Sequence, residues 1–192
     1  MNKDKIKKVL FDVFIKYQVL FILLVVLDQI TKSIVMSNMA EHESIKILSW
    51  LYIKFEYNTG VAFSFLENAP QWISATFSVI ATIAIEAYLI IKKPKDKIFT
   101  ILLICLAAGA LGNGIDRWLA VFELRKGVVD FIWPTFFANF NVADIYVTCS
   151  CFIMMVYFLL SNEDKNKQTY KKVEVSNEQQ TQIKFKDEDN EQ

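Results

Sequence analysis

The sequence predicts an all-α membrane protein, in which four helices form a transmembrane bundle that carries a small extracytoplasmic β-rich loop domain. Hydrophobic residues make up 54% of the 192 positions and include 16 Phe, which is too apolar for a soluble domain of this length. The apolar residues also gather into four stretches of about 20 residues, the length of a helix that crosses a bilayer. The predicted spans are Tyr17–Met36, Trp72–Ile91, Ile98–Ile115 and Val142–Leu160.

Lysine placement predicts the orientation of these spans. Five lysines lie in residues 1–16, four lie in the short link 92–97, and further lysines follow the fourth span. The longer connections 37–71 and 117–141 carry few basic residues for their length. Because basic residues are retained in the cytoplasm, we expect both termini inside and these two connections outside.

The segments that flank the core, residues 17–160, have different compositions. In residues 1–16, apolar side chains recur at helical spacing between lysines, which predicts an amphipathic helix in the headgroup plane on the cytoplasmic side. Residues 161–192 are dominated by charged and amide side chains and contain too few apolar ones to form a core. We expect a disordered cytoplasmic tail.

The first outer connection, 37–71, contains a strand-like stretch from Ile45 to Phe65. Apolar and polar side chains alternate through its middle, as in a strand that is buried on one face. Asn58 and Gly60 follow the alternation and predict a turn. A small sheet on the outer membrane surface would hold this turn close to the outer ends of the third and fourth spans.

Composition excludes several classes of function. The chain has 21 basic and 21 acidic residues, so nothing in its charge favours a nucleic-acid partner. Its three cysteines lie in apolar stretches without C-x-x-C spacing, and it has one histidine, His42. We therefore expect no metal site and no cofactor, and we interpret the cysteines as small apolar residues.

Ionisable residues inside a bilayer are costly, so those in the first span need a reason. Asp28 and Lys32 are four residues apart, which is one helical turn. They could form a structural ion pair, with Lys32 reaching outward to the interface. Alternatively, they could point into the bundle and position a substrate.

A polar face is also predicted at the outer end of the third span. Asn113, Asp116 and Arg117 are spaced to share one side of the helix. We expect Asp116 and Arg117 to form an interfacial pair that fixes the helix end, and Asn113 to donate a hydrogen bond to a ligand or to a catalytic carboxylate.

Two further carboxyl groups approach the same membrane surface. Asp130 lies in an apolar run, Gly127 to Phe131, of the second outer connection, and Asp144 lies at the start of the fourth span. Taken singly, Asp130 could be a solvated loop residue and Asp144 a helix cap. Taken together, they suit an aspartate dyad, in which one carboxylate takes a proton from water and the other donates one to a peptide carbonyl. The apolar neighbours of Asp130 predict that it holds the proton, because they raise its pKa.

The order of these motifs resembles that of the lipoprotein signal peptidase family, also called type II signal peptidases. Five blocks carry the resemblance, and they are Asp28-Gln29-Ile30-Thr31-Lys32, Asn58-Thr59-Gly60-Val61-Ala62-Phe63, Gly112-Asn113-Gly114-Ile115-Asp116-Arg117, Gly127-Val128-Val129-Asp130-Phe131 and Phe140-Asn141-Val142-Ala143-Asp144. Together they extend over most of residues 17–160.

The resemblance implies that Asp130 and Asp144 are the catalytic pair. It implies that a larger set of residues binds substrate or supports the site, namely Asp28, Lys32, Asn58, Gly60, Asn113, Asp116, Arg117, Asn141 and Ala143. The implied substrate is a diacylglyceryl-modified prolipoprotein, cut on the N-terminal side of its lipidated cysteine at the outer face of a bacterial cytoplasmic (inner) membrane. Globomycin is the implied inhibitor.

The chain departs from the family pattern at three places. Ala108 stands where a second glycine is frequent, Gly114 replaces a larger apolar residue, and the link from Arg117 to Asp130 is longer than is common. The long link raises the question of whether it gates the site. We expect a monomer whose partners are its substrates and membrane lipid.

Two other classes of function are open to a helical bundle with buried acids. A transporter or proton relay would place its acids in a chain across the bilayer, whereas these acids cluster at one surface and no inverted repeat is visible. A non-enzymatic scaffold would tolerate Asp130→Asn. Cleavage of a lipid-modified precursor distinguishes the three.

Overall fold

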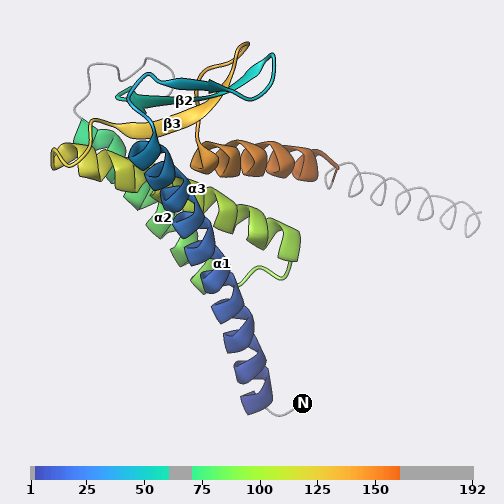
Figure 1. The fold of residues 1–192 in the computed structure, drawn as a ribbon. Coiled ribbons are helices and arrows are strands. Elements are labelled where there is room, and N and C mark those ends of the chain that lie inside the picture. Colours follow the sequence, from blue (N-terminus) through green and yellow to red (C-terminus); the bar gives the residue numbers. More distant parts are fainter. Residues whose placement is uncertain (1–2, 61–70, 161–192) are drawn as a thin grey trace, which may run out of the picture. The chain divides into compact units, whose positions relative to one another are not determined.

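The computed structural model describes residues 3–60 and 71–160, and side chains from residue 15 onward. Four of its helices are long and apolar enough to cross a membrane: Ile15–Asn38, Gln71–Lys92, Lys97–Val121 and Val142–Leu160. The first is part of α1 (Lys3–Asn38), the second is α2 (Gln71–Lys92) and the third is α3 (Lys97–Val121) (Figure 1). The predicted fold class is therefore confirmed.

The helix bounds extend the predicted spans. The third span continues six residues further than expected, to Val121. Helix α1 begins at Lys3 and runs without a break, so residues 3–16 are the first turns of the same helix as the first span. The interfacial position proposed for that segment stays a prediction. The predicted disordered tail, 161–192, lies outside the described residues.

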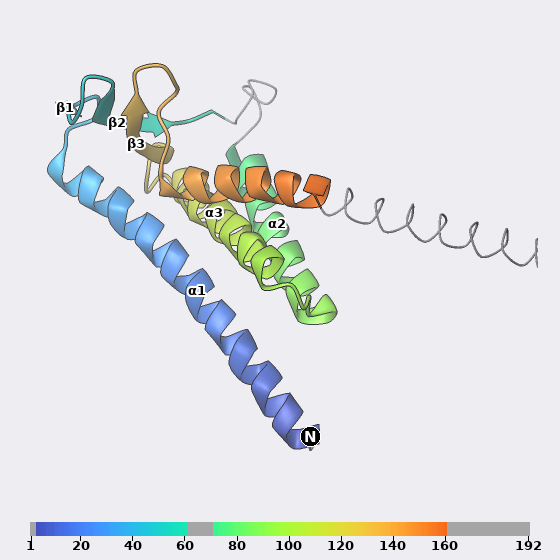
Figure 2. The ribbon, with the colours of Figure 1, turned by 90° about the vertical axis from the view of Figure 1, so that its right-hand side faces the viewer.

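Helix α3 is the element against which the other two labelled helices pack. Helices α2 and α3 lie side by side and antiparallel in both ribbon views (Figure 2). Ser78 of α2 touches the position of Gly114, where an added Cβ would come within 2.9 Å of the Ser78 Cβ. The unusual glycine at this position thus lets α2 and α3 approach closely.

A three-stranded antiparallel sheet has the order β1 (Ser44–Lys46), β2 (Leu51–Asn58) and β3 (Val128–Pro134). The first two strands lie within the predicted β-rich connection. The third is a correction, because sequence analysis placed residues 128–134 in a loop. A run of β-branched and aromatic residues, Val128 to Trp133, favours a strand, and β2 offers an edge to pair with.

The sheet is joined to the C-terminal end of α1 by a small apolar core. Val35 of α1 packs with Phe55 of β2 and with Val129 and Phe131 of β3, and each is at most 8% exposed. Val129 and Phe131 precede and follow Asp130 in the sequence, and both side chains point into this core. The apolar contacts therefore fix the strand on which Asp130 lies.

Candidate active site

Asp130 lies in the middle of β3 and is 3% exposed. Asn58, at the end of β2, donates a 3.0 Å hydrogen bond from Nδ2 to Asp130 Oδ2. The strand register pairs Asp130 with Glu56 and Asn58 with Val128, so Asn58 and Asp130 are diagonal neighbours on one face of the sheet. The turn predicted after this strand is present, with the Gly60 N–H donating to Asn58 Oδ1.

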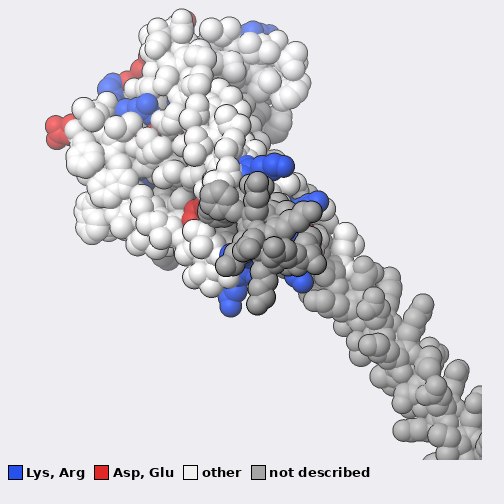
Figure 3. Space-filling model, turned by 90° about the horizontal axis from the view of Figure 1, so that it is seen from below, with Lys and Arg blue, Asp and Glu red and all other residues white. Residues whose placement is uncertain are grey.

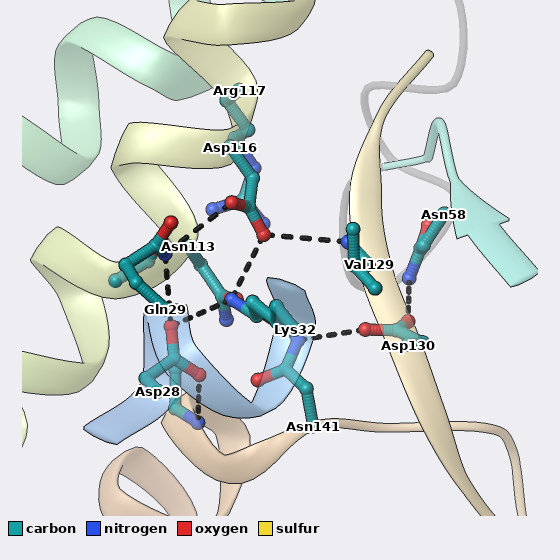
Figure 4. A network of polar contacts seen from close by, with 12 residues as sticks. Asp28, Gln29, Lys32, Asn58, Asn113, Asp116, Arg117, Val129, Asp130 and Asn141 are labelled. Carbon is teal, nitrogen blue, oxygen red and sulfur yellow. Dashed lines mark hydrogen bonds and ion pairs between the residues drawn. The ribbon is translucent and has the colours of Figure 1, made fainter. Parts of the chain in front are cut away.

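The second partner of Asp130 is Asn141, which directly precedes the fourth helix. The segment before it returns along β3, where Phe140 exchanges backbone hydrogen bonds with Ile132. Asn141 is fully buried and donates from Nδ2 to Asp130 Oδ1 at 2.7 Å. Both oxygens of the Asp130 carboxyl thus accept a hydrogen bond from an asparagine amide (Figure 4).

Asn141 also orients Asp144, through reciprocal capping of the fourth helix. Asn141 Oδ1 accepts from the Asp144 N–H at 3.1 Å, and Asp144 Oδ2 accepts from the Asn141 N–H at 3.0 Å. This exchange satisfies N–H groups that a helix N-terminus leaves free. Asn141 therefore contacts both carboxyl groups of the predicted dyad. Its side-chain amide donates to Asp130, and its backbone N–H donates to Asp144.

Asn113 of α3 connects this pair to the first span. Its Nδ2 donates to Asp144 Oδ1 at 2.7 Å. Its Oδ1 accepts from Lys32 Nζ at 2.9 Å and from Asn141 Nδ2 at 3.0 Å. The predicted hydrogen bond from Asn113 is thus made to the carboxylate of Asp144.

Lys32 is the centre of a buried ion-pair network. Its Nζ lies 2.8 Å from Asp28 Oδ2 and 2.9 Å from Asp116 Oδ2, and all three side chains are fully buried. Lys32 thus forms the ion pair with Asp28 that the first alternative expects, but it points into the bundle rather than outward to the interface. The other oxygen of Asp28 accepts from the Ala143 N–H at 2.9 Å, which ties the first span to the start of the fourth helix.

Asp116 does not form the expected pair with Arg117. Within the described part of the chain, Asp116 pairs with Lys32 and with Arg125 of the long link, and no ion pair joins it to Arg117. It also accepts from the backbone N–H of Val129, at 3.3 Å. Asp116 thus holds β3 at the residue next to Asp130, with its charge offset by two cations.

Arg117 instead contacts α2. It donates to Ser78 Oγ at 3.4 Å, and its buried Nε has no hydrogen-bond partner among the described residues. Its charge interacts with those of Asp144 and Asp130. Arg117 therefore offers an unused donor beside the two carboxyl groups.

Glycine allows α3 to approach the first span at the site. A Cβ at Gly112 would lie 2.6 Å from Asp28 Oδ2 and 3.3 Å from the Ala143 Cβ. A Cβ at Gly109 would lie 2.5 Å from the Ala143 carbonyl oxygen. Substitution at either position would push apart the helices that carry the network.

Burial raises the pKa of Asp130 to about 7, and the negative charge of Asp144 adds to the effect. The amide donors Asn58 and Asn141 act in the opposite direction but do not offset it. A carboxyl group at this pKa is partly protonated at neutral pH. The direction agrees with the prediction from the apolar neighbours of Asp130.

The structure brings most of the predicted site residues into one hydrogen-bonded network, whereas Arg117 donates to Ser78, outside that network. Gly60 lies at its edge, and the rest of its motif, residues 61–63, lies outside the described residues. His42 is absent from the network; its exposed side chain lies near Glu41 and Glu56 instead.

Sequence reasoning missed three members of the network. Gln29 donates to Asp28 and to the Gly112 carbonyl, at 3.1 and 3.0 Å. Arg125 pairs with Asp116, and Asn139 donates to the Asp130 carbonyl oxygen at 3.2 Å. Gln29 could have been found as a polar residue inside an apolar span. Nothing in the local sequence marks Arg125 or Asn139.

Comparison with known proteins places the chain among bacterial membrane peptidases. The family model described as signal peptidase (SPase) II matches residues 20–160. A lipoprotein signal peptidase of Symbiobacterium thermophilum is 35% identical over 148 residues, which cover 74% of this chain and 93% of the relative. One from Francisella tularensis subsp. novicida is 34% identical over 161 residues, covering 78% and 94%.

Solved structures show the same fold. A bacterial membrane enzyme determined by the in meso method at 2.3 Å resolution superposes with a TM-score of 0.68 at 28% identity, covering 78% of this chain and 91% of that one. A second such structure, at 1.9 Å resolution, gives a TM-score of 0.64. The extent of the family match and the identity to these relatives show that the chain belongs to the signal peptidase II family, as a multi-pass bacterial membrane peptidase.

Proposed function

We propose that this protein is an aspartic endopeptidase that removes signal peptides from diacylglyceryl-modified prolipoproteins, cutting before the lipidated cysteine. Family membership supports the cleavage of prolipoprotein signal peptides. The finer assignment rests on one observation: Asp130 and Asp144 are held together by shared asparagines, while the fully buried Asp28 and Asp116 pair with cations.

The reaction divides between the two carboxyl groups. Asp144, which accepts hydrogen bonds from two N–H donors, serves as the carboxylate that removes a proton from water. The resulting hydroxide forms a bond to the scissile carbonyl carbon, while Asp130 donates its proton to the carbonyl oxygen. The product of this step is a neutral gem-diol, with the proton of water on Asp144 and Asp130 ionised.

Collapse of the gem-diol restores the site. Asp130 takes back a proton from one hydroxyl as the carbonyl re-forms, the C–N bond breaks, and Asp144 delivers its proton to the leaving nitrogen. The products are a carboxylic acid and an amine, and each aspartate returns to its starting state. Each proton transfer contributes about 10²- to 10⁴-fold to the rate.

The remaining residues support this division of labour. Asn113 and Asn141 fix the two carboxyl groups, and the free Nε of Arg117 is placed to bind a substrate carbonyl. We further propose that both termini are cytoplasmic and that the site faces outward, which the lysine distribution supports. An interfacial site lets water reach the scissile bond while the acyl chains stay in lipid.

The test is cleavage of a diacylglyceryl-modified precursor by Asp130→Asn and Asp144→Asn in detergent or lipid. Each variant should lose at least about 10²-fold in turnover while globomycin binding stays measurable. Because the carboxyl groups act as one unit, the double variant should be barely slower than either single one. Near-normal turnover by either single variant would remove the dyad, and multiplicative losses would argue for separate roles.

A further inference from the structure

A second candidate site lies between the helices, away from the network around Asp130. It is a cavity of about 450 Å³ between α1, α2 and α3. Apolar residues line most of it, including Phe21, Ile83, Ile90 and Leu111. Ile83 and Ile90 are exposed, so the cavity continues onto the apolar outer surface. Seen from below, the described surface is mostly uncharged, with Lys and Arg side chains gathered near the grey atoms (Figure 3).

One acidic residue, Glu86 of α2, lines this cavity. Its Oε2 accepts from Gln18 Nε2 of α1 at 2.7 Å. Its Oε1 is buried and has no hydrogen-bond partner among the side chains that the structure describes. A carboxyl oxygen inside a span is costly to leave unpaired, so this geometry calls for a donor supplied by a ligand.

The depth of Glu86 below the active site follows from helix packing. Thr82 Oγ1 lies 3.4 Å from the Ala107 carbonyl oxygen, so these residues of α2 and α3 are level. Glu86 is one turn beyond Thr82 toward Lys92, and Asn113 is six residues from Ala107 in the opposite direction. At 1.5 Å per residue, Glu86 therefore lies about 15 Å from the level of Asn113 along the helix axes.

We propose that this cavity binds the signal helix of the substrate and that Glu86 pairs with a basic residue at the N-terminal end of that helix. The proposal rests on the proposed function. Signal peptides carry a positively charged segment before an apolar stretch of roughly 7–15 residues. Inside a bilayer that stretch must be helical, so it spans roughly 10–22 Å, which matches the depth of Glu86.

Charge complementarity supports the same occupant. Lys92, Lys93, Lys95 and Lys97 gather at the end of the bundle where Glu86 lies, and they would repel a basic signal segment. Glu86 supplies an opposing charge at the edge of that cluster. Gln18, which also lines the cavity, is eleven residues from Gln29 of the network, about three helical turns, so the two lie on one face of α1 and an apolar helix along that face would lead from Glu86 toward the network.

The experiment uses the full-length protein in nanodiscs and two diacylglyceryl-modified precursors that differ in one residue. The first has a single lysine before its apolar stretch, and the second has glutamine there. Both are cleaved by the wild type, Glu86→Gln, Glu86→Asp and the control Glu123→Gln, which removes an exposed carboxyl group far along the chain from the cavity. The amide in Glu86→Gln can still accept from Gln18, so the α1–α2 contact is retained.

The wild type should have about a fivefold lower KM for the lysine precursor, the size of a partly exposed ion pair. Glu86→Gln should raise that KM to the value for the glutamine precursor, without changing kcat for either. Glu86→Asp should retain part of the preference, and Glu123→Gln all of it.

Equal cleavage of the two precursors by the wild type would overturn the proposal. So would an equal effect of Glu86→Gln on both precursors, since that result would point to a lipid or a structural role for the cavity. In contrast, failure of the wild type to cleave either precursor would refute the peptidase function itself, so the two failures are distinguishable.

Discussion

The raised pKa of Asp130 predicts that the folded protein becomes less stable as the pH rises from about 4 to 7. A buried carboxyl group with a pKa of about 7 keeps its proton in the folded state. In the unfolded chain the same group is ionised above about pH 4. Folding therefore takes up a proton in this window, and raising the pH opposes folding.

The size of this effect follows from the two pKa values. With 3.8 for the unfolded chain and about 7 for the folded one, ionisation of Asp130 costs the folded state about 2.5 kcal/mol more at about pH 8 than at about pH 5. Asp130→Asn removes the titration. Asparagine also disturbs the hydrogen bonds from Asn58 and Asn141, but that loss acts at both pH values and cancels from the difference.

The assay is the free energy of unfolding in detergent, measured at about pH 5 and about pH 8 for the wild type, Asp130→Asn and the control Glu123→Gln. Titrating groups other than Asp144, which interacts with Asp130, contribute alike to all three. Asp130→Asn should be less sensitive to pH than the wild type by about 2.5 kcal/mol, whereas Glu123→Gln should match the wild type. If Asp130→Asn keeps the wild-type pH dependence, Asp130 is not a buried, largely protonated acid.

Other predictions concern activity. Cleavage should decline as the pH rises through about 7, because Asp130 loses the proton it donates; a rate that keeps rising to about pH 9 would contradict this role. Asn113→Ala should lower inhibitor affinity and turnover by roughly tenfold, because Asp144 and Lys32 each lose a buried partner; unchanged values would remove Asn113 from the site. Deleting residues 161–192 should leave cleavage intact in a protein that still inserts, since the tail lies outside every motif. EDTA and replacement of all three cysteines should also spare activity, and inactivation that added metal reverses would assign another mechanism.

Much of the architecture could be predicted because bilayer insertion imposes simple rules on sequence. A span needs about 20 apolar residues, and the predicted bounds of the fourth span coincide with the observed helix. Alternation in the connection 37–71 revealed β2, because one face of that strand carries Phe55, which packs on Val35 of α1 and on β3. Strand β3 was missed because its two faces are both largely buried, which removes the alternation.

The partners within the site were harder to predict than its members. Asp116 and Arg117 are adjacent in sequence, and helical geometry separates their directions by about 100°. Asp116 therefore reaches Lys32 on α1, while Arg117 reaches Ser78 on α2. The partner Arg125 comes from the long link, whose path depends on backbone bonds to Leu119 rather than on any local pattern. That link is anchored at Asp116, which argues against a freely moving gate.

The network assigns different partners to acids with different roles. Asp28 and Asp116 each form an ion pair with a cation, which suits a structural role. Asp130 and Asp144 receive amide N–H groups and form no ion pair within the described residues. An amide can orient a carboxyl group without neutralising it, so two acids can share a site while one keeps its proton at neutral pH. A lysine in place of Asn58 would hold Asp130 as firmly but lower its pKa, and the acid that the reaction needs would be lost.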